Sequence, residues 1–148
     1  MSQKEPAREP SGGAAEHHHV LPANAEAIES ALEEMMRLVE QDESSCGDPA
    51  EIRLAMREAL NNALRHGNKM DPTKKIHFSY SCDSQQGLWV MIRDEGRGFD
   101  PDAVPDPTQP ENLDRTGGRG VFLMRNLMDE VDFRDGGREV QMRRRPRS

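Results

Sequence analysis

The sequence reads EALNNALRHG at residues 58–67, and this stretch decides most about the fold. Apolar residues run into it at helical spacing, so we expect one helix over 48–66, with Gly67 as its C-terminal stop. Glu58 and Asn62 lie about one turn apart on this helix, which makes their side chains neighbours. A carboxylate beside a carboxamide oxygen suits a general base and a ligand of Mg²⁺. A Glu/Asn pair on a solvated helix face is the simpler interpretation of this segment alone.

A second segment, DEGRGFDP at residues 94–101, follows a β-type run. Asp94 stands where the strand ends, so its carboxylate can accept a hydrogen bond from the exocyclic amine of adenine. Gly96 and Gly98 allow the backbone to approach a nucleotide closely. Taken alone, this pattern is also typical of a simple turn.

A third segment, RTGGRG at residues 115–120, closes a proline-rich loop over 100–116. An apolar pattern at helical spacing follows it, so we expect a third helix after Gly120. Gly118 and Gly120 would then present bare backbone N–H groups at a helix N-terminus, where anions bind. A plain helix-entry loop is the alternative interpretation.

Hydrophobic periodicity and turn residues predict the remaining elements, which are one helix over 24–41 and two hairpins. The strands of the first hairpin span 76–81 and 88–93, and those of the second span 131–134 and 138–142. This order predicts an α+β fold, a two-layer sandwich with helices on one face of a mostly antiparallel sheet. We expect the folded domain to span 17–142, between a disordered tail over 1–16 and a basic tail over 143–148.

Two polar patterns have plain alternatives. His17–His19 could suggest a metal site, but three adjacent histidines on a strand cannot all face one ion, so we expect an entry strand here. Nine acids and one base lie between Glu26 and Glu51. They indicate either a solvated helix face or a docking surface for a basic partner.

Composition excludes several classes of protein. The 20 Lys and Arg against 27 Asp and Glu give a net charge of −7, which speaks against direct nucleic-acid binding. No apolar run approaches the roughly 18 residues of a membrane span. The N-terminus lacks the pattern of a signal peptide, so we expect a cytoplasmic protein. The phosphate-binding patterns GxxxxGK[ST] and GxGxxG are absent.

Taken together and in this order, the three segments resemble the Bergerat ATP-binding fold of the GHKL ATPases, the group that includes gyrase, histidine kinases and MutL. The chain from Val20 to Met142 most closely resembles the stand-alone anti-sigma regulatory factors, which are bacterial serine-protein kinases. The resemblance implies an ATP- and Mg²⁺-dependent kinase of a partner-switching system, which binds a sigma factor and phosphorylates a STAS-domain antagonist. A homodimer would also fit this family.

The resemblance also implies roles for single residues. It makes Glu58 the general base, Asn62 the Mg²⁺ ligand, and Asp94 the aspartate that recognises adenine. The other residues implied in ATP binding are two glycine pairs and a lid arginine: Gly96 and Gly98, Gly118 and Gly120, and Arg115.

The chain departs from the family pattern at one position. Family members commonly carry threonine after the glycine of the last hairpin, whereas Arg138 and Glu139 follow Gly137 here. This departure favours one alternative, a non-catalytic switch that binds nucleotide and a partner. A histidine-kinase catalytic module is a second alternative, disfavoured because no helical segment carries a phosphoacceptor histidine. A regulator of another signalling protein is a third.

Overall fold

The computed structural model describes residues 16–41, 47–69, 71–96 and 116–146. Its helices are α1 (Ala25–Gln41), α2 (Pro49–Asn62) and α3 (Thr116–Leu127). Its strands are β1 (His17–Leu21), β2 (Ile76–Asp83), β3 (Gly87–Asp94), β4 (Glu130–Arg134) and β5 (Glu139–Arg144). A π-helical turn, η1 (Ala63–Gly67), continues α2, and a short 3₁₀ turn, η4 (Asp135–Gly137), joins β4 to β5.

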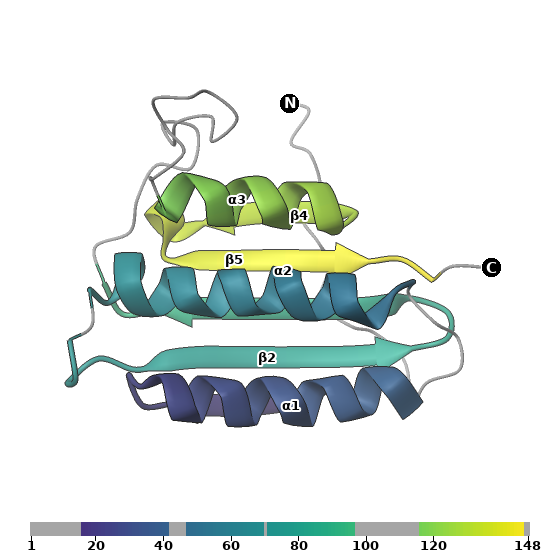
Figure 1. Cartoon of the computed structure of the whole chain (residues 1–148), viewed down its shortest axis with the longest axis horizontal. Helices are drawn as coiled ribbons and strands as arrows, with labels where there is room; N and C mark the ends of the chain where they lie inside the picture. Colours follow the sequence, from purple (N-terminus) through teal and green to yellow (C-terminus); the bar gives the residue numbers. More distant parts are fainter. Residues whose placement is uncertain (1–15, 42–46, 70, 97–115, 147–148) are drawn as a thin grey trace.

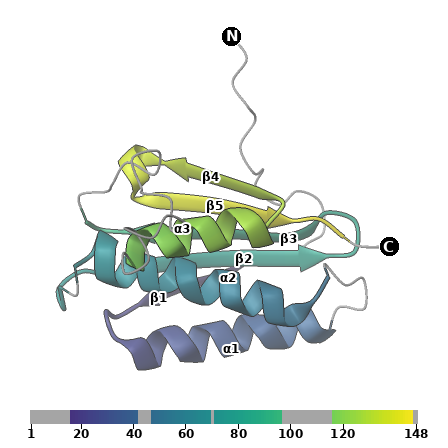
Figure 2. The ribbon, with the colours of Figure 1, turned by 45° about the horizontal axis from the view of Figure 1, so that its top comes forward.

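The strands of the described part form one antiparallel sheet in the order β1-β2-β3-β5-β4. The three helices lie side by side on one face of this sheet, with α2 between α1 and α3 (Figure 1). Seen after a 45° turn, the sheet and the helices form two layers (Figure 2). The predicted α+β sandwich is therefore confirmed.

Local sequence explains where α1 and α2 begin. The side chain of Asn24 accepts a hydrogen bond of 2.8 Å from the backbone N–H of Ala27, and that of Asp48 accepts one of 2.9 Å from Ala50. Pro49 follows Asp48 in the first turn of α2, where its missing N–H costs no hydrogen bond. Both helix starts agree with the sequence to within one residue.

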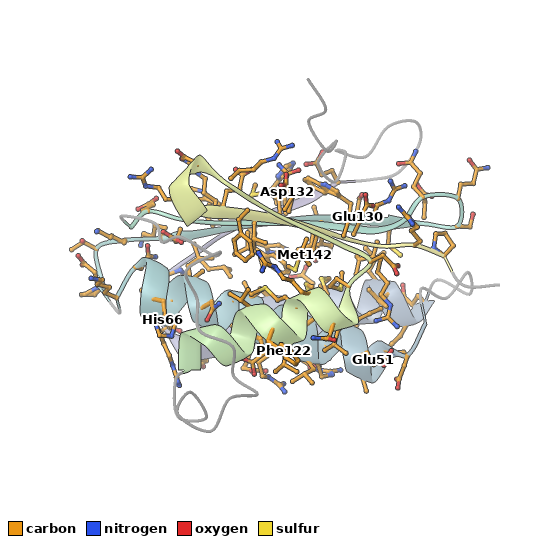
Figure 3. All side chains as sticks on the ribbon, turned by 90° about the horizontal axis from the view of Figure 1, so that it is seen from above. Glu51, His66, Phe122, Glu130, Asp132 and Met142 are labelled. Atoms are coloured by element: carbon orange, nitrogen blue, oxygen red, sulfur yellow. The ribbon has the colours of Figure 1, made fainter. Side chains whose placement is uncertain are left out.

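The core lies between the two layers. Each helix buries one apolar stripe against alternate side chains of the strands, because strand residues point to opposite faces in turn. Met142 of β5, for example, points from the sheet toward the helices (Figure 3). The largest fully buried side chains are Ile28, Leu32, Met35, Met36, Ile52, Met56, Leu60, Ile76, Phe78, Tyr80, Leu88 and Ile92.

Two of the differences from the expected element bounds bear on the packing of the domain. α3 begins at Thr116 and not after Gly120, so the glycine segment opens the helix itself. β5 extends through Arg144, two residues into the segment expected as a basic tail. Arg144 can lie inside the domain, with 3% of its surface exposed, because it donates to the carboxylate of Glu51 at 2.7 Å and to the carbonyl of Leu127 at 2.6 Å.

Three of the acidic residues of α1 have partners on α2. Glu33 bonds to Arg53 of α2, and Glu29 bonds to Arg57 at 2.9 Å, so both arginines of α2 face this acidic helix. Glu40 lies 3.8 Å from Arg53. Much of the acidic density therefore serves the α1–α2 contact, which weakens the interpretation of this face as a docking surface for a basic partner.

His17–His19 are the first residues of β1, which confirms the expected entry strand. His17 and His19 stack on Tyr80 of β2, with ring centroids 5.1 Å and 5.5 Å away. His18 points to the other face and bonds to Ser79 at 2.7 Å. None of the helices in the described part of the chain is both long and apolar enough to cross a bilayer.

Candidate nucleotide site

A pocket opens between the helices and the sheet, at the end where β3 finishes. Its empty volume is about 280 Å³, including the solvent at its mouth. The lining residues come from both layers and are Ala59, Asn62, Ala63, Ile92, Asp94, Met124, Phe133, Gly137, Arg138 and Val140. The pocket therefore brings together Asn62 and Asp94, which sequence analysis selected from separate segments.

Asp94 is the buried charge of this site. It is the last residue of β3, and only 4% of its surface is exposed. One carboxylate oxygen, Oδ1, accepts a hydrogen bond of 2.8 Å from the backbone N–H of Gly96. Burial raises the pKa of this carboxyl, while the Gly96 N–H and the positive charge of Arg138 act in the opposite direction. A carboxylate kept in a pocket against this cost is typical of a functional site.

Gly67 and Gly96 pack the backbone closely around Asp94. A Cβ atom at Gly67 would lie 2.2 Å from Oδ2 of Asp94, and one at Gly96 would lie 1.7 Å from the carbonyl oxygen of Gly67. Sequence analysis gave Gly67 the role of helix stop. The left-handed conformation near this helix end belongs instead to Lys69, with φ of 53°. Gly67 is needed because no side chain fits beside Asp94.

The turn that holds Gly67 is π-helical. The backbone N–H of Asn68 bonds to the carbonyl of Ala63 at 2.8 Å, five residues back, so the end of the helix is widened by one residue. Such turns occur frequently at functional sites. Here the widened turn brings Gly67 against Asp94 at the edge of the pocket.

Asn68 is a buried residue that sequence analysis missed. It is 1% exposed, donates to the carbonyl of Lys75 at 2.9 Å and accepts from the backbone N–H of Glu95 at 2.8 Å. It therefore joins the end of α2 to the turn after Asp94. Its place directly after Gly67 was the only signal in the sequence.

Asn62 and Gly120 meet at the boundary between α2 and α3. A Cβ atom at Gly120 would lie 3.0 Å from Oδ1 and 3.2 Å from Nδ2 of Asn62, so the glycine leaves room for the carboxamide. Glu58 lies one turn earlier on α2, is partly buried, and is not among the residues that line the pocket. Its role as general base stays a prediction.

The other predicted residues divide into two groups. Gly118 lies in α3, in its first turn, and not in a loop as expected. The reason for the early helix start is visible at Gly120, whose lack of a side chain permits the close approach to α2 and offsets the low helix propensity of glycine. Gly98 and Arg115 lie outside the described residues.

The packing around Gly67 makes a first prediction. We expect Gly67→Ala to lower stability by about 1–3 kcal/mol, because the new methyl group collides with Asp94, and to weaken nucleotide binding at the same time. Thermal unfolding and calorimetric titration with ADP measure the two effects. Gly120→Ala is the graded comparison, with a smaller loss expected, since its nearest neighbour would be 3.0 Å away. Parental stability and affinity in Gly67→Ala would contradict the close packing.

Comparison with known proteins assigns the fold to a family. A family described as the histidine kinase-like ATPase domain matches residues 21–144. The chain belongs to this family. It is also similar to the serine-protein kinase RsbW of Staphylococcus epidermidis, with 29% identity over 130 residues, which cover 82% of this chain and 81% of the relative. The serine-protein kinase RsbW of Staphylococcus aureus strain JH9 is 28% identical over 129 residues, with the same coverage.

Membership of this ATPase family implies ATP binding, and the pocket at Asn62 and Asp94 is the candidate site for it. The site offers a nucleotide base an apolar pocket with a carboxylate in it, since Ala59, Ala63, Ile92 and Met124 line the pocket together with Asp94. Oδ2 of Asp94 accepts no hydrogen bond from the residues that the structure describes, which leaves an acceptor at the pocket for a base amine.

Proposed function

We propose that this chain is a protein-serine kinase that uses Mg-ATP, and that it acts as one member of a partner-switching pair. The observation that carries the proposal is the common pocket of Asn62 and Asp94, one carboxamide and one buried carboxylate from opposite layers. The similarity of the chain to serine-protein kinases over 82% of its length supports the same activity.

Each residue has a separate task in this proposal. Asp94 accepts a hydrogen bond from the adenine amine, which selects the base and fixes its orientation at the end of β3. Asn62 faces the boundary with α3, where the phosphates would lie near the first turn of that helix. Glu58, one turn away, would take the proton of the serine hydroxyl that attacks the γ-phosphate.

The residues present also fit a Mg²⁺ ion held mainly by nucleotide and water. The described residues contain no group of three or more His, Cys, Asp and Glu side chains able to hold a metal ion by themselves. Mg²⁺ usually takes one or two protein ligands and fills its octahedron with water and phosphate oxygens. The carboxamide oxygen of Asn62 would be the protein ligand, and the ion would neutralise charge on the phosphates.

Asn62→Ala tests this assignment. We expect the variant to lose the part of the ATP affinity that depends on Mg²⁺ and to keep its affinity for ADP in the presence of a chelator. Calorimetric titration with and without Mg²⁺ separates the two. Asn61→Ala, on the adjacent position of α2, is the matched control because Asn61 does not line the pocket. Equal Mg²⁺ dependence in Asn62→Ala and the parent would remove Asn62 from the metal site.

The partners are part of the proposal and rest on the resemblance to anti-sigma regulatory factors. The ATP-loaded protein would hold a sigma factor in the cytoplasm, and a small STAS-domain antagonist would receive the phosphate on a serine. A second copy of the chain would complete a homodimer.

Affinity capture in the presence of ATP tests the proposed partners. The tagged chain is incubated with a lysate of its source cells, and mass spectrometry identifies the bound proteins and their phosphosites. We expect a sigma factor and a small protein phosphorylated on serine. Capture of neither protein with ATP present would contradict the partner-switching assignment.

A further inference from the structure

Arg138 lies beside Asp94 and joins two turns of the site. It lines the pocket, and its Nε donates a hydrogen bond of 2.8 Å to the carbonyl oxygen of Gly96. Its Nη1 lies 3.3 Å from both the carbonyl oxygen and Oδ1 of Asp135. The guanidinium therefore links the turn after β3 to the turn before β5.

Further hydrogen bonds extend the link between these two turns to Arg93 and Asp94. Asp135 also accepts a hydrogen bond of 2.5 Å from Arg93, and the backbone N–H of Asp94 bonds to the carbonyl of Arg138 at 2.9 Å. On the other side, the N–H of Gly96 binds Oδ1 of Asp94. Gly96 therefore accepts from Arg138 through its carbonyl and donates to Asp94 through its N–H, so that one residue connects the guanidinium to the carboxylate.

We propose that Arg138 is a positioning residue of the nucleotide site, which fixes the Gly96 turn and keeps the carboxylate of Asp94 charged and aimed into the pocket. This inference rests on the proposed function, because it requires Asp94 to contact the base. It adds a residue that reaches the nucleotide through Gly96 and Asp94, and it gives the arginine at this position a definite task.

The charges around Asp94 support the electrostatic half of the proposal. The positive groups that act on this carboxyl are Arg138 just before β5, Arg93 on β3 and Lys74 before β2. Of these charges, Arg138 has the largest effect, and it opposes the burial that raises the pKa of Asp94. Removal of the Arg138 charge should therefore raise that pKa further.

The test is calorimetric titration with ADP over a range of pH, with the full chain. Arg138→Gln keeps a similar stem but loses the charge, so we expect roughly tenfold weaker binding at neutral pH, the loss of about one charge-assisted hydrogen bond. Its loss of affinity toward low pH should also begin at a higher pH than in the parent. Arg138→Lys should bind more weakly than the parent but keep the parental pH profile.

Arg134→Gln is the matched control. Arg134 lies on the same hairpin and is as exposed as Arg138, 38% in each case, but it pairs with Asp132 away from the pocket. Figure 3 shows Asp132 on the face of the sheet opposite to the helices. We expect parental affinity and a parental pH profile from this variant.

Several outcomes would overturn the inference. One is parental affinity in Arg138→Gln, and another is a weaker affinity with an unchanged pH profile, which indicates a merely structural role. If Arg138→Gln does not fold, parental affinity in Arg138→Lys overturns it equally. A parent chain that binds no ADP would contradict the proposed function itself. If the parent binds ADP and Arg138→Gln binds it with the same affinity, only this inference is contradicted.

Discussion

Asp94→Asn is expected to lose adenine-nucleotide binding while the fold stays intact. The amide can still accept the N–H of Gly96 through its oxygen, but its NH₂ group then faces the donor amine of adenine. Loss of a hydrogen bond to a charged acceptor costs about 1.5–3 kcal/mol, or roughly 10- to 150-fold in affinity. Calorimetric titration with ADP measures this loss. Unchanged affinity in a folded variant would remove Asp94 from the site.

The same variant should be more stable than the parent when no nucleotide is present. The pKa of Asp94 is raised by burial, so the ionised form is disfavoured in the folded chain relative to the unfolded one. This penalty is full above the folded-state pKa and disappears as pH falls toward the unfolded value near 3.8. Thermal unfolding should therefore show a higher Tm for Asp94→Asn at neutral pH and a shrinking difference at acid pH. A lower Tm at neutral pH would contradict the assigned cost.

Glu58→Gln is expected to retain Mg-ATP binding and to lose phosphoryl transfer by roughly 10²–10⁴-fold, the usual contribution of a general base. Because Glu58 does not line the pocket, its carboxylate can be replaced without changing the contacts of the bound adenine. Calorimetry and single-turnover transfer to the captured partner separate the two effects. Glu51→Gln is not a suitable control, since Glu51 binds the buried Arg144.

Asn61→Gln serves as a control for Glu58→Gln, because it changes a partly exposed position one turn along the same helix. We expect parental transfer from this control. Transfer that survives in Glu58→Gln would favour the non-catalytic or differently catalysed alternatives over the proposed base.

The helices and their starts could be predicted because they depend on local chemistry. Asn24 and Asp48 accept hydrogen bonds from the N–H groups of the first turns, and the apolar residues that follow repeat at helical spacing. The pairing of the hairpins follows in the same way from alternation and turn residues. These local features were sufficient to predict the two-layer architecture.

Other features required tertiary contacts that a single sequence does not reveal. Glycine at position 67 is typical of a helix stop. The structure shows that glycine is needed there because the carboxylate of Asp94, which is distant in sequence, leaves no room for a side chain. The glycines before Val121 indicate a loop by propensity, whereas packing of Gly120 against Asn62 makes them helical. Arg144 looked like part of a basic tail and is buried because Glu51 lies opposite.

The site itself was predicted in part. Asn62 and Asp94 carry groups whose chemistry is visible in the sequence, and the structure places both at one pocket. The contributions of Asn68 and Arg138 could not be predicted, since each acts through hydrogen bonds to backbone atoms of another segment. Sequence marked Arg138 only as a departure, and the contact with Gly96 gives that departure a physical meaning.

Transfer of labelled phosphate from the γ-position of ATP to the captured partner tests the central claim most directly. The chain, the partner, ATP and Mg²⁺ are incubated together, and the phosphorylated residue is identified by mass spectrometry. We predict label on a serine of the partner with the parent chain, and at least tenfold less with Asp94→Asn when ATP is held near the concentration that half-saturates the parent. Label on a histidine of the chain itself, or no transfer with an intact parent that binds Mg-ATP, would contradict the assignment as a protein-serine kinase.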